Sequence, residues 1–328
     1  MLERLKRPWP DHRAERALGA VSLLLGVVIV AMIAFVAVRS WPIFQHNGLR
    51  WLGGGGDFEA EIARMNAATA HPTAADYQLR AWPLLYGTLL STAIAVALGI
   101  AIAVLASVFI VELAPRRLSR VVIPVVRLLA SVPSVIYGLI GILVLVPFVG
   151  NHLVSEGDRR SVLGVVQLTG AGLAPTVAIL TVMITPIMIA LVCEALEAVP
   201  PSWKEGAVAL GLNPLRAVRA VTLKAIRPAI VAAAVLATAR ALGEAVMIQM
   251  VSGGKTFAPN LDHGVPVFLF EPLRTLASAI LDFREGIGSP SLKAAVYSFS
   301  LLLLLSAFVL SVGGYLVKLP LRRHQARA

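Results

Sequence analysis

Charged residues are scarce in this chain of 328 residues, where Asp, Glu, Lys and Arg make up 14% of the sequence against about 25% in ordinary soluble domains. Apolar residues take their place at 58%, and the mean hydropathy is +0.81. This composition excludes a soluble protein built around a single core. The net charge of +11 would suggest a nucleic-acid partner in a soluble protein, but in so apolar a chain it indicates membrane topology.

Cysteine is also nearly absent, with Cys193 as the single example. One cysteine excludes an intrachain disulfide framework and any multi-cysteine zinc or iron–sulfur site. The six histidines lie scattered in tails and loops without ligand spacing, so we expect no metal site. Gly254-Lys255-Thr256 resembles the end of a phosphate-binding loop, but Gln249 stands where that motif needs its first glycine. We therefore expect no catalytic residue and no nucleotide or other cofactor bound by this chain.

Long apolar runs, by contrast, occur six times, and each is close to the 20 or so residues that cross a bilayer. The expected spans cover residues 17–39, 84–113, 121–149, 171–193, 228–251 and 291–317. The first is too long for the apolar region of a signal peptide, so we expect a retained anchor. The predicted fold class is an all-α integral membrane protein with six transmembrane helices.

The basic residues set the orientation, because short cytoplasmic loops collect Lys and Arg. Seventeen of the 29 basic residues fall on the side of both termini, in the segments 1–16, 114–120, 194–227 and 318–328. We expect that side to be cytoplasmic and the two basic tails, 1–16 and 318–328, to lie against the anionic inner leaflet. The loops at 40–83 and 252–290 are then extracytoplasmic.

The first extracytoplasmic loop contains Gly53–Gly56, a flexible hinge by composition, followed by an amphipathic segment at 57–68. Its apolar residues Phe58, Ile62 and Met65 recur near helical spacing, which predicts a short helix outside the bilayer. That helix serves either as a packing lid over the helix ends or as a docking surface for a partner.

Proline interrupts the third span, where Pro133 stands between Ser131 and Ser134. Such breaks persist in hydrocarbon where protein or a watery cavity satisfies the freed carbonyl groups. Ser131, Pro133 and Ser134 are therefore candidates for lining a pathway, with simple helix packing as the alternative. Arg127 is a weaker candidate, because it lies near the inner end of its helix and can reach the interface.

Two charges lie in the middle of the fifth span, at Arg240 and Glu244. At about 1.5 Å of rise per residue, Arg240 lies roughly 18 Å from the inner end of the span. Their spacing of four residues puts both on one helical face, where they can form a static pair. The functional alternative is that Arg240 offers a permanently charged, multi-donor partner to a passing anion while Glu244 holds the guanidinium and limits the affinity.

The largest inner loop, 194–227, predicts two short helices. Ser202 and Glu205 have the spacing of a capping box, and Gly211 stands where a left-handed residue would end a helix over Trp203–Leu210. Asn213-Pro214 then begins the next helix. Such a pair of helices either caps the bundle or forms a rigid knob that enters a cleft in another protein.

The residues of this loop resemble the EAA loop of ABC importer permeases, the coupling helix that docks on the ATPase. Glu205-Gly206-Ala207 is followed after three residues by Gly211, and after nine more by Val221-Thr222-Leu223. The chain departs from the pattern at Gly206, where the family has alanine, at Val221 for isoleucine and at Lys224 for proline. The resemblance implies that Trp203, Glu205, Gly206, Ala207 and Gly211 couple the chain to an ATPase.

Four further motifs are similar to those of the phosphate-specific importer permeases. They are Tyr86–Leu89 (YGTL), Val132–Gly138 (VPSVIYG), Ala239–Glu244 (ARALGE) and Thr275–Ile280 (TLASAI). The residues after Glu244 and the long first outer loop look more like PstC-type than PstA-type subunits. The resemblance spans roughly residues 40–317 and implies a type I ABC importer permease core at 84–317, with phosphate passing Arg240 and Glu244.

The resemblance also implies partners: a PstA-like sister permease, a PstB-like ATPase dimer that uses ATP and Mg²⁺, and a PstS-like extracytoplasmic phosphate-binding protein. The predicted function is the membrane-spanning permease subunit of an ATP-driven phosphate importer in a prokaryotic inner membrane, without enzymatic activity of its own. One alternative is the same architecture carrying another oxyanion such as molybdate or sulfate. The other is a membrane enzyme or stand-alone carrier, for which the helices contain no acid–base or metal constellation.

Overall fold

A computed structural model of the chain describes residues 12–54, 57–68, 72–162, 166–256, 258–284 and 288–325. Outside the described residues lie parts of the two predicted basic tails, at 1–11 and 326–328. The last two glycines of the predicted hinge, at 55 and 56, also lie outside them. Five helical segments in the described part are long and apolar enough to cross a membrane, and a sixth appears if one bent pair is counted as a span. The candidate spans are Glu15–Leu52, Ala74–Leu113, Ser134–His152, Leu173–Glu197 and Pro290–Val317, with the pair Pro214–Ala225 and Arg227–Leu242.

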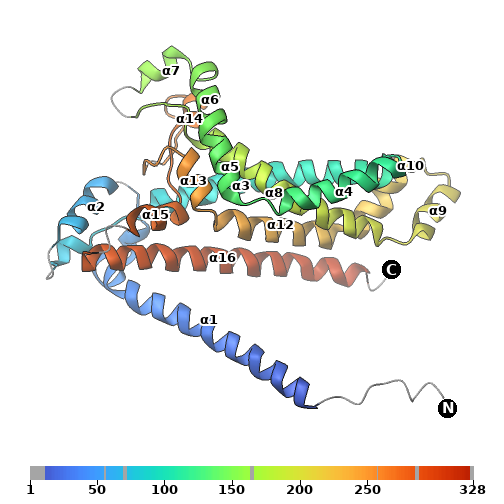
Figure 1. Ribbon diagram of the computed structural model, residues 1–328, viewed down its shortest axis with the longest axis horizontal. Coiled ribbons are helices and arrows are strands. Elements are labelled where there is room, and N and C mark those ends of the chain that lie inside the picture. Colours follow the sequence, from blue (N-terminus) through green and yellow to red (C-terminus); the bar gives the residue numbers. More distant parts are fainter. Residues whose placement is uncertain are drawn as a thin grey trace.

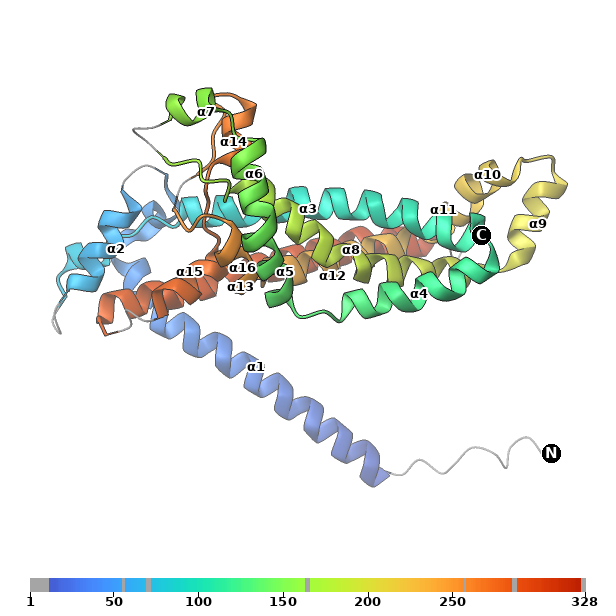
Figure 2. The same ribbon diagram turned by 45° about the horizontal axis from the view of Figure 1, so that its top comes forward.

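The long helices run side by side along the molecule (Figures 1 and 2). They are α3 (Trp82–Val108), α8 (Leu173–Glu197), α12 (Arg227–Leu242) and α16 (Pro290–Gln325). Helix α8 lies at the centre and is mostly buried. Gly99 permits its close approach to α3, because a Cβ there would lie 2.5 Å from Cε of Met188. The core of the bundle therefore forms around α8.

Helix α1 (His12–Asn47) stands apart from this bundle, meeting α16 at one end and diverging from it at the other (Figure 1). At the joined end the rings of Phe35 and Tyr297 meet edge to face with centroids 5.7 Å apart. Most of the apolar side chains of α1 are exposed. In a bilayer, lipid covers such side chains at no cost, so a helix of this kind needs few protein contacts.

Two of the expected spans are interrupted. The third divides into α4 (Arg116–Ala130), α5 (Ser134–Ile140), a π-helical turn at Gly141–Leu145 and α6 (Val146–His152), rather than one helix over 121–149. The fifth divides into α12 and α13 (Val246–Val251), separated by Gly243, Glu244 and Ala245, rather than running through 228–251. Proline marks the first break, at Pro133, and the second has no proline.

The predicted amphipathic helix in the first outer loop is confirmed as α2 (Phe58–Ala67), and Asp57 caps it by accepting a hydrogen bond from the Ala60 amide at 3.1 Å. Phe58, Ile62 and Met65 are all buried, and the ring of Phe58 packs against Phe283 of α15 and Phe299 of α16. Its apolar face is thus turned into the protein, which favours the packing lid over the docking surface. Short helices complete the outer end: η2 (Gly48–Leu52), η3 (Ala74–Tyr77), α7 (Glu156–Ser161), α14 (Val265–Phe270) and α15 (Leu276–Phe283).

At the opposite end lie α9 (Pro201–Ala209), α10 (Pro214–Ala217), a π-helical turn at Val218–Thr222 and α11 (Leu223–Ala225). The predicted capping box is wrong: Ser202 lies inside α9, because Pro201 takes the first helical position, where its fixed φ favours initiation. The predicted end is confirmed, since Gly211 has φ +86° and the amides of Gly211 and Leu212 bond to the carbonyls of Val208 and Ala207. Asn213 caps α10, as predicted, through the Leu215 amide.

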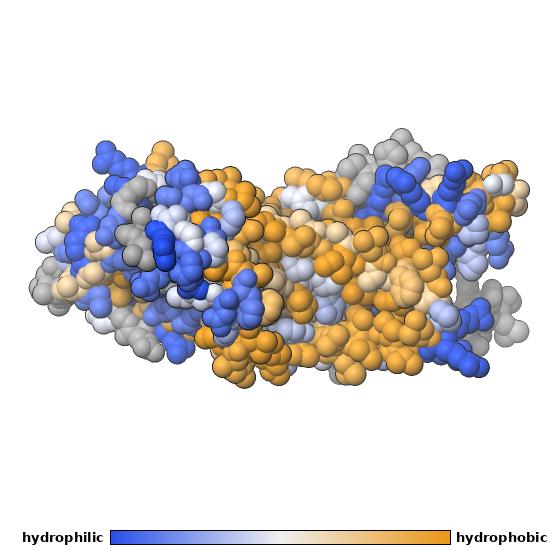
Figure 3. Space-filling model, turned by 90° about the horizontal axis from the view of Figure 1, so that it is seen from above, coloured by the Kyte–Doolittle hydropathy of each residue, from blue (hydrophilic) through white to orange (hydrophobic). Residues whose placement is uncertain are grey.

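A space-filling view shows apolar residues across the middle of the molecule and hydrophilic residues gathered at its two ends (Figure 3). The outer end carries α2, α7 and α14, and the inner end carries α9 and α10. An apolar middle between two hydrophilic ends is the surface expected of a protein that spans a bilayer. The chain is a multi-pass membrane protein.

Candidate functional site

The two midspan charges lie at the break between α12 and α13. Arg240 is in the last turn of α12, and Glu244 follows the end of that helix, in the three-residue segment that separates it from α13. Glu244 is buried, with 9% of its surface exposed, and Arg240 is half-buried. Thirteen residues of α12 precede Arg240, which places it about 20 Å from the inner end of the helix.

Arg240 and Glu244 do not pair with each other among the described residues. Glu244 instead accepts a hydrogen bond from the Met247 amide at 3.2 Å, which caps the start of α13. Nε of Arg240 is buried without a hydrogen-bond partner in the described part of the chain. Arg240 lies at the C-terminus of α12 and Glu244 at the N-terminus of α13. Each charge is thus opposite in sign to the partial charge of its helix end.

The helix that follows the break in the third span packs against the helix that follows Glu244. Gly138 of α5 allows the approach, because a Cβ there would lie 3.0 Å from Cα of Met247 and 2.8 Å from Sδ of Met250, both in α13. Tyr137 donates a hydrogen bond from its hydroxyl to the Leu129 carbonyl at 3.0 Å, across the break. The two interrupted spans are thus packed against each other, and a side chain replaces one of the lost helical bonds.

The residues predicted to line a pathway occupy the exposed side of that break. Ser131 closes α4 by donating to the Leu128 carbonyl at 2.7 Å, and Pro133 and Ser134 begin α5. Ser131 and Pro133 are exposed and Ser134 is half-buried. Arg127 lies elsewhere, in an exposed ion pair with Glu194 of α8 at 3.1 Å. The structure thus packs α5, which follows the third-span break, against α13, which follows Glu244, and it pairs Arg127 with Glu194 of α8.

The predicted coupling residues form α9 and its C-terminal turn at the inner end. Trp203 and Glu205 are exposed and Ala207 is buried. A Cβ on Gly206 would meet no atom within 4 Å, so the departure from the family alanine requires no change in packing. Lys204 joins α9 to the π-helical turn at Phe109–Leu113, which follows α3, through an ion pair with Glu112 at 2.6 Å. A short helix with an exposed tryptophan is held firmly to the bundle.

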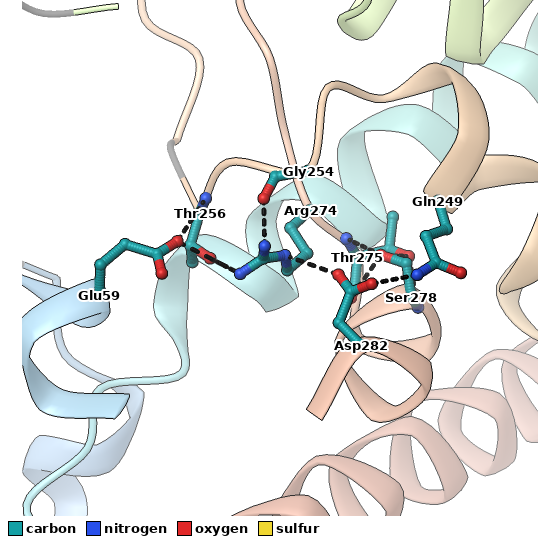
Figure 4. Close-up of polar contacts among 8 residues, drawn as sticks. All are labelled: Glu59, Gln249, Gly254, Thr256, Arg274, Thr275, Ser278 and Asp282. Carbon is teal, nitrogen blue, oxygen red and sulfur yellow. Dashed lines mark hydrogen bonds and ion pairs between the residues drawn. The ribbon is translucent and has the colours of Figure 1, made fainter. Parts of the chain in front are cut away.

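Sequence reasoning missed a polar network on the outer side, centred on Arg274 (Figure 4). Arg274 pairs with Glu59 of α2 at 3.2 Å and with Asp282 of α15 at 3.1 Å, and it donates to Thr256 at 2.8 Å and to the Gly254 carbonyl. Gln249 of α13 donates a hydrogen bond from its side-chain amide to Asp282. The guanidinium of Arg274 also lies 5.1 Å from the ring centroid of Phe283. The members of the network come from segments more than 200 residues apart, so no local pattern indicates it.

Two buried carboxyl groups outside the predicted spans have pKa values above their ordinary range. Burial raises the pKa of Glu61, although its bond from the Arg80 amide at 3.0 Å opposes the shift. Burial likewise raises the pKa of Glu271, which accepts a bond from the Asn260 amide at 2.9 Å. Both groups hold loop backbone in place. Within the described residues no group of three His, Cys, Asp or Glu side chains is arranged to hold a metal ion.

Comparison with known proteins agrees with this architecture. Residues 95–318 match the family described as the binding-protein-dependent transport system inner membrane component. The chain is 33% identical over 261 residues to the probable ABC transporter permease protein YqgH of Bacillus subtilis, covering 78% of this chain and 76% of that protein. It is 32% identical over 301 residues to the phosphate transport system permease protein PstC 1 of Mycobacterium tuberculosis, covering 88% and 86%.

A solved structure shares the fold. A chain of a bacterial alginate ABC transporter, crystallised with its alginate pentasaccharide-bound periplasmic protein, superposes with a TM-score of 0.57. The match covers 94% of this chain and 96% of that one at 14% sequence identity. At that identity the likeness concerns the fold alone.

Proposed function

Because the chain belongs to the family of binding-protein-dependent transport system inner membrane components, we propose that it is the PstC-like permease subunit of an ATP-driven phosphate importer. As a member of that family it is a membrane subunit that works with a separate ATPase and an extracytoplasmic binding protein. The similarity to a mycobacterial phosphate permease over 88% of the chain supports phosphate as the transported ion. Inorganic phosphate carries one or two negative charges near neutral pH and needs a polar route across the belt.

Arg240 is the residue on which this proposal chiefly rests. Arg240 lies about 20 Å from the inner end of α12, and its Nε is buried without a partner in the described chain. A planar guanidinium presents several donors in a geometry that matches phosphate oxygens. Glu244, two residues past the end of α12, limits how tightly an anion is retained, because like charges repel in a site of low dielectric.

The exposed residues at the break of the third span give the route its other wall. Ser131 and Ser134 supply hydroxyl groups, and Pro133 keeps the backbone open. Their exposure on an isolated chain fits a pathway formed between this chain and a PstA-like sister permease. Arg127, which is already paired with Glu194, contributes to the inner end of that route at most through its charge.

Helix α9 transmits the movement of the ATPase in this proposal. Trp203 and Glu205 face solvent and would enter a cleft of a PstB-like ATPase dimer, which binds ATP and Mg²⁺. The turn at Gly211 and the ion pair of Lys204 make α9 a rigid lever on the bundle. Phosphate delivered by a PstS-like binding protein would pass Arg240 when that lever moves the interrupted helices.

Uptake of labelled phosphate tests the proposal in cells that lack their own high-affinity system and carry this chain with its partners. Arg240→Gln should abolish uptake at equal membrane abundance and with the complex still assembled. Arg39→Gln is a matched control, since Arg39 is exposed on α1 and its guanidinium lies over the ring of Phe35 at 5.3 Å. Undiminished uptake by Arg240→Gln would reduce Arg240 and Glu244 to structural residues.

Substrate competition separates phosphate from the alternative of another oxyanion. An excess of unlabelled phosphate should suppress the labelled uptake, and equal excesses of molybdate or sulfate should leave it unchanged. Absence of phosphate uptake by the unaltered chain, with molybdate or sulfate accumulated instead, would assign the transporter to that ion.

A further inference from the structure

A basic pocket lies at the inner end of the molecule, at the bend where α11 meets α12. The pocket has a volume of about 630 Å³ and four exposed basic side chains, Arg216, Arg219, Lys224 and Arg227. Leu212 and Leu223 contribute apolar surface to the same pocket. We propose that this pocket binds the phosphate group of an anionic ligand, namely the headgroup of an acidic lipid of the inner leaflet.

The local backbone explains why the four charges converge. The π-helical turn at Val218–Thr222 has hydrogen bonds that span five residues, one more than in an α-helix. Arg219 and Lys224, which are five residues apart, therefore both reach the pocket. The chain then bends by 63° before α12, so that Arg227 closes the pocket from the next helix.

The charges in this pocket are uncompensated. None of the four basic side chains forms an ion pair with a described acidic residue, and none of the residues that line the pocket is acidic. A second inner pocket offers a contrast, because Glu197 lies in it beside Arg116 and Arg120. Four like charges in one concavity repel one another, and a phosphate group relieves that repulsion while accepting bonds from several guanidinium nitrogens.

The position of the pocket favours a lipid as the source of that phosphate. The hydrophilic inner end that carries α9 and α10 lies directly beyond the apolar belt (Figure 3). Apolar surface from Leu212 and Leu223 beside a basic rim suits a headgroup whose acyl chains continue along the belt. Free inorganic phosphate has the same chemistry and is the other source to be distinguished. A lipid held at the bend would stabilise the angle between α11 and α12, and hence the position of α9.

The test counts lipids on the purified importer, which comprises this chain with its sister permease and ATPase, by native mass spectrometry. The probes are dioleoyl phosphatidylglycerol, dioleoyl phosphatidylcholine and inorganic phosphate. The variant is Arg219→Gln with Lys224→Gln, and the control is Arg50→Gln with Arg160→Gln, which removes two exposed charges from the outer end. A second variant, Arg219→Lys with Lys224→Arg, keeps the charge. Because lipid counting does not involve transport, its outcome is independent of the proposed function.

We expect one phosphatidylglycerol per chain to bind in preference to phosphatidylcholine. The double glutamine variant should lower that affinity about 30-fold, at roughly fivefold for each basic residue, and the control and the charge-retaining variant should not. If millimolar inorganic phosphate displaces the lipid through the same residues, the pocket binds both sources. Equal phosphatidylglycerol binding by all proteins would overturn the proposal. Loss of the ATPase from the double variant at unchanged lipid binding would also overturn it and assign the surface to the ATPase.

Discussion

Replacing Lys204 with methionine should loosen α9, the proposed coupling helix, from the transmembrane bundle. Nζ of Lys204 lies 2.6 Å from Oε1 of Glu112, in the π-helical turn that follows α3, and α3 packs along the central helix α8. The pair thus links the side chains of α9 to the core of the bundle. Methionine keeps the length of the side chain and removes only the charge and its hydrogen bond.

The exposure of the two side chains sets the expected magnitude. Exposed ion pairs contribute about 0 to 1 kcal/mol, whereas removing one partner of a fully buried pair costs about 3 to 5 kcal/mol. The side chain of Glu112 is 9% exposed and that of Lys204 is 28% exposed, so Lys204→Met, which leaves a buried carboxylate alone, should cost about 2 kcal/mol. Glu112→Gln leaves a longer cation that can reach water and should cost about 1 kcal/mol.

The double variant should cost less than the two single variants together, because it leaves no unpaired charge. We expect a coupling free energy of about 2 kcal/mol between Lys204 and Glu112. Two quantities are measured on the assembled importer in proteoliposomes: its thermal stability and the number of phosphate ions transported per ATP hydrolysed. Lys204→Met should lower the transport ratio while ATP hydrolysis continues, since in the proposed mechanism a loosened α9 moves without moving the bundle.

The pair of Arg127 and Glu194 provides the matched control. It also links two helices, at 3.1 Å, but its side chains are 55% and 56% exposed, so its coupling energy should be below about 0.5 kcal/mol. Strictly additive effects at Lys204 and Glu112, or a coupling no larger than that of the control pair, would refute the reasoning. An unchanged transport ratio in Lys204→Met would show that α9 is held in place by other contacts.

Three further predictions concern backbone geometry and protonation. Gly138→Ala should destabilise the protein and reduce uptake, because its Cβ would meet Cα of Met247 at 3.0 Å. Gly206→Ala should be tolerated, and thermal melting together with phosphate uptake distinguishes the two variants. Gly211→Ala should cost about 1 kcal/mol at the left-handed turn, seen as a lower melting temperature, and an unchanged one would contradict this. Burial raises the pKa of Glu61, so the folded protein holds the proton of this carboxyl group more tightly than the unfolded chain does. The unfolding free energy should therefore fall as pH rises just above the ordinary pKa of 4.5. Glu61→Gln should flatten this dependence in thermal melts between about pH 4.5 and 7.5, and an unaltered profile would count against it.

Local sequence signals were enough to predict α2 and the end of α9. The apolar residues Phe58, Ile62 and Met65 recur at helical spacing, and their face is buried as that spacing requires. Gly211 ends its helix for a reason that lies in its own backbone. Ser202 was misjudged because two signals competed at the start of α9, and Pro201 determined the first helical residue.

The division of the fifth span, by contrast, has only a weak local signal in the sequence, the glycine at Gly243. The segment up to Leu242 is rich in alanine and favours helix, and the break at Gly243–Ala245 contains no proline. The close packing of α13 on Gly138 instead favours the break, and that contact joins residues more than 100 positions apart. The network around Arg274 escaped prediction for the same reason, since Glu59 and Asp282 are brought to it by the fold.

The break changes the energetics of the two midspan charges. In a continuous helix Arg240 and Glu244 would offset each other's insertion cost, which is about 2.5 to 3.5 kcal/mol for each charge at the bilayer centre. Because of the break, Glu244 accepts a hydrogen bond from the Met247 amide. Arg240 interacts instead with the partial negative charge at the C-terminal end of α12, which contributes about 0.3 to 1 kcal/mol. A deficit of roughly 2 kcal/mol therefore remains at Arg240, and no described residue of this chain supplies it through a bond to Nε. A partner subunit would supply it in every state of the protein, whereas the anion of the proposed route would supply it only while it is bound beside Arg240.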